Sequence, residues 1–131
     1  MAIVEWDGSL AVGVEAIDRQ HRELFRIINS FHDKIGREED SFALAVVLDS
    51  LKNYVTYHFG FEEKLLERNG CPELAGHQAL HDSFAQAVER FEAGLVQPSR
   101  QDLLELQTYL LDWLVNHIQA QDLRLAPFMK P

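Results

Sequence analysis

Hydrophobic residues recur at every third or fourth position along most of the chain, a period typical of helices that bury one face. The pattern predicts four helices, over residues 18–35, 41–69, 72–91 and 99–125. Glycine and proline gather in the short links, and no alternation of apolar and polar residues is long enough for a strand. Because short links favour antiparallel neighbours, we predict an all-α fold, an up-down-up-down four-helix bundle at residues 18–131. Residues 1–17 should form an irregular N-terminal arm whose Trp6 packs against the bundle.

Short polar residues mark where these helices should begin. Asp18 is the expected N-cap of the first helix, and Asp40 or Ser41 that of the second. Ser99, with Asp102 three residues later, has the spacing of a capping box at the start of the fourth helix.

Length and charge narrow the kinds of function that the chain can have. Its 131 residues fit a single domain, residues 1–131. With 12 Lys and Arg against 21 Asp and Glu, the net charge is -9, so nucleic acid and anionic membrane surfaces are unsuitable partners. No apolar run approaches the roughly 18 residues of a membrane span and no signal peptide is evident, so we expect a cytoplasmic protein without membrane insertion. Cys71 is the single cysteine, which excludes an internal disulfide and a thiolate metal cluster.

Histidines interrupt the apolar stripes of all four predicted helices. Five of the six histidines lie on these stripes: His21, His58, His77, His81 and His117. One histidine on an apolar face is usually a core residue hydrogen-bonded to a carbonyl group. Burying five without partners would cost several kcal/mol each, against a typical net stability of roughly 5–15 kcal/mol. We therefore predict that the five imidazoles share a bound partner.

Helical spacing identifies which carboxylates join them. Residues four apart lie one turn along the same face, so His58 with Glu62, and His77 with His81, can each chelate one centre. Glu63 is rotated from His58 by about 140° and is expected to be solvated.

Two further residues, Asp122 and His32, do not fit this four-residue spacing. Asp122 lies five residues after His117, so an undistorted α-helix would direct the two apart, and we predict a widened turn between them. His32 lies on the same line as His21 but ~16 Å farther along the helix, so we expect it to be structural or at the surface.

Five imidazoles and two carboxylates exceed what one ion needs, since a mononuclear zinc site takes about four ligands. Two metal ions are implied, and this ligand set suits iron, manganese or zinc. Two six-coordinate ions would have nearly every position filled by these residues and a bridging oxygen from water, which leaves one position open. Neutral imidazoles disfavour high oxidation states, which favours binding of a small ligand over oxygen activation.

These residues resemble the hemerythrin family, in particular its single-domain bacterial members. The resemblance covers the Trp6 arm, Ile17-Asp18-Arg19-Gln20-His21, the pairs His58-x-x-x-Glu62 and His77-x-x-x-His81, and Trp113-Leu114-Val115-Asn116-His117 followed by Asp122. It implies one iron with His77, His81 and His117, and a second with His21 and His58. Glu62, Asp122 and an oxo or hydroxo group would bridge the two irons, and O2 would bind at the iron with two histidines.

Reversible O2 binding requires a dry pocket. The candidates next to the ligands are Leu24, Phe59, Trp113, Leu114 and Ile118, for each of which ordinary core packing is an equally good explanation.

The resemblance implies reversible O2 binding for storage, delivery or buffering, with no enzymatic activity. Delivery would require an O2-consuming recipient protein. One alternative is a di-iron redox enzyme acting on peroxide, O2 or nitric oxide, and another is an oxygen or redox sensor acting through a separate partner. The ligand set accepts iron or manganese, and the sequence leaves the oligomeric state open.

Overall fold

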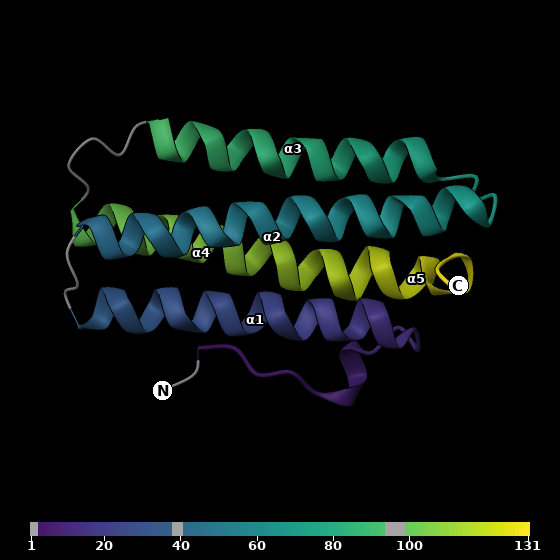
Figure 1. The fold of residues 1–131 in the computed structure, drawn as a ribbon, viewed down its shortest axis with the longest axis horizontal. Helices are drawn as coiled ribbons and strands as arrows, with labels where there is room; N and C mark the ends of the chain where they lie inside the picture. Colours follow the sequence, from purple (N-terminus) through teal and green to yellow (C-terminus); the bar gives the residue numbers. More distant parts are fainter. Residues whose placement is uncertain (1–2, 38–40, 94–98) are drawn as a thin grey trace.

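Four long helices form the body of the protein in a computed structural model, which describes residues 3–37, 41–93 and 99–131, with side chains from residue 45 onward in the second range. They are α1 (Glu15–Gly36), α2 (Ser41–Arg68), α3 (Leu74–Ala93) and α4 (Arg100–His117). Figure 1 shows them side by side with alternating direction, which confirms the predicted up-down-up-down bundle. None of the described residues belongs to a strand.

Short elements complete the two ends of the chain. The 3-10 helix η1 (Gly8–Leu10) precedes α1. After α4 the chain continues as the π-helix η2 (Ile118–Asp122), the short helix α5 (Leu123–Leu125) and the 3-10 helix η3 (Ala126–Phe128). Figure 1 shows α4 and α5 along one line. α4, η2 and α5 therefore form one continuous rod, the fourth rod of the bundle.

The predicted N-cap of the first helix is wrong. α1 begins at Glu15, and Val14 occupies the cap position without a side-chain hydrogen bond. The Asp18 carboxylate instead accepts hydrogen bonds from the backbone N–H groups of Val12, at 2.8 Å, and Gly13, at 3.2 Å. Gly13 has a φ of 86°, a left-handed conformation that glycine adopts without steric cost. Asp18 therefore fastens the arm to the helix from inside the first turn.

The other two predicted caps have different outcomes. Ser99 and Asp102 form the reciprocal capping box: Asp102 N donates to Ser99 Oγ at 3.1 Å, and Ser99 N donates to Asp102 Oδ2 at 3.0 Å. This prediction is confirmed. α2 begins at Ser41, and the alternative cap Asp40 lies outside the described residues.

The N-terminal arm packs against the bundle, as predicted. The Trp6 ring meets Phe25 edge-on, with 5.7 Å between ring centroids. The Asn29 side chain accepts hydrogen bonds from the backbone of Ile3 and Val4 and donates one back to Val4. The arm thereby covers the outer side of α1.

Buried apolar side chains form two clusters along the bundle. The larger includes Phe31, Leu51 and Leu106, and the smaller includes Ile17, Leu66, Leu125 and Met129. On α1, α2 and the fourth rod, the buried histidines and carboxylates lie where the sequence passes from one cluster to the other. Hydrophobic packing on both sides therefore fixes the helices around a polar layer. No helix of the described residues is sufficiently long and apolar to span a membrane.

Candidate metal centre

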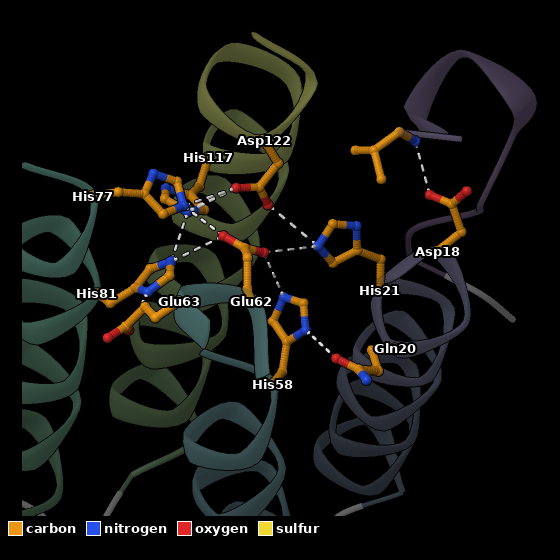
Figure 2. A network of polar contacts seen from close by, with 11 residues as sticks. Asp18, Gln20, His21, His58, Glu62, Glu63, His77, His81, His117 and Asp122 are labelled. Carbon is orange, nitrogen blue, oxygen red and sulfur yellow. Dashed lines mark hydrogen bonds and ion pairs between the residues drawn. The ribbon is translucent and has the colours of Figure 1, made fainter. Parts of the chain in front are cut away.

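The five histidines predicted from the stripes meet in this polar layer. Figure 2 shows their rings converging from the four rods on the carboxylates of Glu62 and Asp122. Their potential ligand atoms fall into two groups, and within each group all atoms lie within 4.8 Å of one another. The groups are Glu62, His77, His81 and His117, and His21, His58, Glu62 and Asp122. All seven sequence-predicted ligands are thus brought together.

Glu62 faces both groups, with one oxygen toward each. Its Oε1 lies 2.5 Å from His77 Nε2 and 3.4 Å from His81 Nε2. Its Oε2 lies 3.2 Å from His58 Nε2 and 3.9 Å from His21 Nε2. The four-residue spacing in a regular turn of α2 places His58 and Glu62 on the same face, as predicted.

The fourth rod reaches the centre through a different backbone geometry. Between His117 and Asp122 the helix widens into η2, where Leu123 N donates to Ile118 O, a bond across five residues. This is the widened turn that the spacing predicts, and the prediction is confirmed. A π-turn accommodates one extra residue within an α-helix, so both side chains reach the same side of the rod.

Asp122 also divides its oxygens between the groups. Oδ1 lies 3.2 Å from both His77 Nε2 and His117 Nε2, and Oδ2 lies 3.2 Å from His21 Nε2. Together with Glu62, it places two carboxylates between the two sets of imidazoles.

The centre is closed to solvent and short of hydrogen bonds. Each of the seven residues is at most 6% exposed. Four of the inward-facing atoms have no hydrogen-bond partner among the described residues, namely His21 Nε2, Glu62 Oε2 and both Asp122 oxygens. Buried polar groups without partners are rare because they are costly, and coordination to a cation would satisfy these atoms. The residues present therefore fit a metal site.

The charge balance leads to the same conclusion. Burial alone would lower the pKa of His21 and His77, but Asp122 and Glu62 raise it to about 9 for each. Burial and the neighbouring charge of Glu62 would likewise raise the pKa of Asp122, but the nearby imidazoles of His117, His21 and His77 lower it to about 2. The carboxylates therefore remain ionised and require positive charge beside them, which protons on histidine or metal cations can supply.

Two of the ligand histidines donate a hydrogen bond from the outer ring nitrogen, the Nδ1 atom that points away from the centre. His58 Nδ1 donates to Gln20 Oε1 at 2.7 Å, and His81 Nδ1 donates to Glu63 Oε2 at 2.7 Å. The expectation that Glu63 is merely solvated is wrong, because its direction away from the centre takes it to α3 and it is only 23% exposed. The sequence assigns no role to Gln20, whose place beside His21 in the Ile17–His21 stretch is the available signal.

The predicted pocket residues pack around the ligands. The Phe59 ring stacks on His81 with 3.7 Å between centroids, and the Trp113 ring stacks on His117 at 4.4 Å. Leu24, Leu114 and Ile118 are at most 2% exposed and belong to the larger apolar cluster. These contacts agree with core packing and with a dry pocket alike, so the O2 pocket stays a prediction.

His32 lies apart from the two groups, as predicted. Its Nδ1 is 2.9 Å from Gln107 Oε1, a contact between α1 and α4. Its role is structural.

Comparisons with known proteins identify the family. Residues 12–129 match the model of the hemerythrin HHE cation binding domain. The chain is 35% identical to a bacteriohemerythrin of Stenotrophomonas maltophilia, over 99% of this chain and 84% of the relative. It is 30% identical to a bacteriohemerythrin of Methylococcus capsulatus, over 97% of each chain. A crystal structure of wild-type hemerythrin superposes with a TM-score of 0.85 at 28% identity, covering 98% of both chains. A buried pair of His, Glu and Asp groups inside a four-helix bundle thus accompanies full-length similarity, and the chain belongs to the hemerythrin family.

Proposed function

We propose that this protein binds O2 reversibly at a pair of iron ions held by the seven buried side chains. The observation that carries the proposal is the pair of ligand groups that share Glu62, with unpartnered atoms facing inward. The bacteriohemerythrin relatives, and the O2 binding that membership of the family implies, support it.

Each ligand has a place in this proposal. His77, His81 and His117 would hold one iron, and His21 and His58 the other. Glu62 and Asp122 would bridge the ions together with an oxo or hydroxo group, because each carboxylate directs one oxygen to each set of imidazoles. The iron pair would supply electrons and an open coordination position for O2 at the ion with two histidines.

The surrounding side chains keep water away from the centre. The stacked rings of Phe59 and Trp113 lie against the histidines of one half, and Leu24, Leu114 and Ile118 belong to the apolar cluster beside the polar layer. Exclusion of water strengthens the electrostatic interactions within the site and limits side reactions, which reversible binding requires.

The few buried ionisable side chains besides the seven ligands favour a binding protein over an enzyme. Among side chains that the structure describes, the buried ionisable groups outside the seven are Asp18 and Cys71. Both oxygens of Asp18 accept backbone hydrogen bonds, and Cys71 lies in the smaller apolar cluster. Catalysis of a redox reaction would normally use a free acid or base beside the open position. We therefore propose storage, delivery or buffering of O2, with an O2-consuming protein as the recipient in delivery.

Repeated oxygenation tests this function. The iron-loaded protein is reduced anaerobically, exposed to O2 and then freed of O2, while its visible spectrum is recorded. A band that appears and disappears over several cycles supports reversible binding. Irreversible conversion to the ferric spectrum contradicts it and favours redox turnover.

A further inference from the structure

The two ligand groups differ in what holds them from outside. His81 Nδ1 donates to a carboxylate, that of Glu63, whereas His58 Nδ1 donates to an amide, that of Gln20, and both hydrogen bonds measure 2.7 Å. The outer nitrogens of His21 and His77 are buried and have no hydrogen-bond partner among the described residues. The negative outer partner is therefore on the three-histidine side.

This difference is not balanced by the inner carboxylates. Glu62 and Asp122 each direct one oxygen to each side of the centre, so their charge is divided between the two groups. Glu63 is hydrogen-bonded to His81, so its charge lies beside the three-histidine group alone. It lies on α2, directly after the shared ligand Glu62. A carboxylate that accepts a hydrogen bond from imidazole makes the ring a stronger electron donor to a metal than an amide does.

We propose that Glu63 is a positioning residue that makes the two iron positions electronically unequal, so that the ion bound by His81 is oxidised at the lower potential. The inference rests on the proposed function, since it concerns the iron pair. A negative charge hydrogen-bonded to His81 stabilises the ferric ion more than the ferrous ion. The His81 side chain is 1% exposed and Glu63 is 23% exposed, so the low local dielectric preserves the effect. Glu63 also fixes His81 with its proton on Nδ1 and its Nε2 toward the centre.

Exchanging the two outer partners tests the proposal. Glu63→Gln gives His81 the kind of partner that His58 has, and Gln20→Glu does the reverse. The double variant keeps the net charge and moves the carboxylate to the other half. Glu67→Gln is the matched control, because it removes the same charge from an exposed position of the same helix.

The first measurement is a redox titration of the iron-loaded protein. Loss of an outer partner typically changes metal binding by about 10–100-fold. For Glu63→Gln we expect at least a tenfold loss of ferric over ferrous preference at one ion, a rise of about 59 mV in the lower potential. The gap between the two potentials should narrow in each single variant and shift farthest in the double variant. Glu67→Gln should match the wild type. An unchanged or wider gap in Glu63→Gln overturns the proposal.

The second measurement needs no iron. In the metal-free protein, NMR of the His81 side chain should show a strongly deshielded Nδ1 proton that moves upfield in Glu63→Gln and stays in place in Glu67→Gln. An unmoved signal in Glu63→Gln overturns the proposal even where the variant fails to load iron. Unequal potentials that depend on Glu63, in a protein that fails the oxygenation cycles, would support this inference while refuting the proposed function.

Discussion

Two stretches of helix each deliver a histidine and a carboxylate to the centre, with different spacing. His58 and Glu62 are four residues apart in a regular turn of α2, and their nearest atoms are 3.2 Å apart. His117 and Asp122 are five residues apart across the π-turn η2, and their nearest atoms are also 3.2 Å apart. The same separation of histidine nitrogen and carboxylate oxygen is thus reached from unequal spacing, because the backbone of the fourth rod widens by one residue.

The comparison shows which part of each stretch is constrained. In α2 one regular helical period places the ligand pair, and the apolar residues before and after it, on the same face of the helix. In the fourth rod the extra residue is confined to η2, so that Leu114 before it and Leu125 after it both remain buried. The site therefore depends on the rotational register of each rod more than on a particular spacing.

Deleting Gly60 should have the largest effect, because it breaks the regular turn. The deletion shortens the His58 to Glu62 spacing to three and rotates the following residues, including Leu65 and Leu66, by about 100° relative to the preceding turn. We expect iron content near zero and a loss of more than about 4 kcal/mol in the free energy of unfolding, measured by metal analysis and urea denaturation.

The control for this deletion is Gly60→Ala, which keeps the length of the helix. A Cβ at this exposed position would have nothing within 4 Å. Iron content should be unchanged and stability should rise by about 1 kcal/mol, the difference in helix propensity. A deletion variant that still holds two irons would show that the register of α2 does not align the ligands.

His117→Ala and His32→Ala should separate a ligand from a structural histidine. We expect His117→Ala to lose one iron or both, because the residue lies in the three-histidine group. His32→Ala removes a contact with Gln107 and should keep the full iron content. Metal analysis of both purified variants is the test, and equal loss in the two would contradict the ligand assignment.

Removing the metal should loosen the π-turn more than the regular turn. A ligand that binds only the folded state stabilises it by about 2.7 kcal/mol at a hundred times its dissociation constant, so chelation should lower the melting temperature. Without a cation to hold Asp122, amide hydrogen exchange should accelerate more at residues 118–122 than at residues 58–62. Equal acceleration in both turns would show that the π-turn is stable by itself.

Deleting Ala120 should have the smallest effect. Ala120 is exposed within η2, and its loss gives His117 and Asp122 the four-residue spacing of a regular helix. Since a π-turn adds one residue without changing the register on either side, the variant should keep two irons. We expect its free energy of unfolding to stay within about 0.5 kcal/mol of the wild type. Loss of iron would mean that the wide turn itself is required.

Periodicity alone predicts the four rods, the five histidines on their stripes and the pairing of His58 with Glu62, because each follows from rotation about one helix axis. Asp122 departs from that period, and the widened turn follows from requiring both His117 and Asp122 at one centre. Asp18 shows where this reasoning fails: it has the chemistry of an N-cap, but the backbone of the preceding arm offers two N–H groups that it binds instead. A cap depends on local chain direction, which the apolar period does not specify.

The hydrogen-bond partners of His81 and His58 escape prediction for a different reason. Glu63 does point away from the centre, as its angle predicts, but the space there belongs to α3 and not to solvent. Gln20 reaches from α1 to His58 on α2. Contacts of this kind depend on how neighbouring helices are rotated and offset against one another, which no single-helix pattern contains.

Anaerobic titration with ferrous iron tests the central claim most directly. The wild-type protein should bind two ions per chain, and Glu62→Ala, which removes the carboxylate that faces both groups, should bind neither tightly. Saturation at a single ion, or undiminished binding by Glu62→Ala, would contradict a shared two-iron centre.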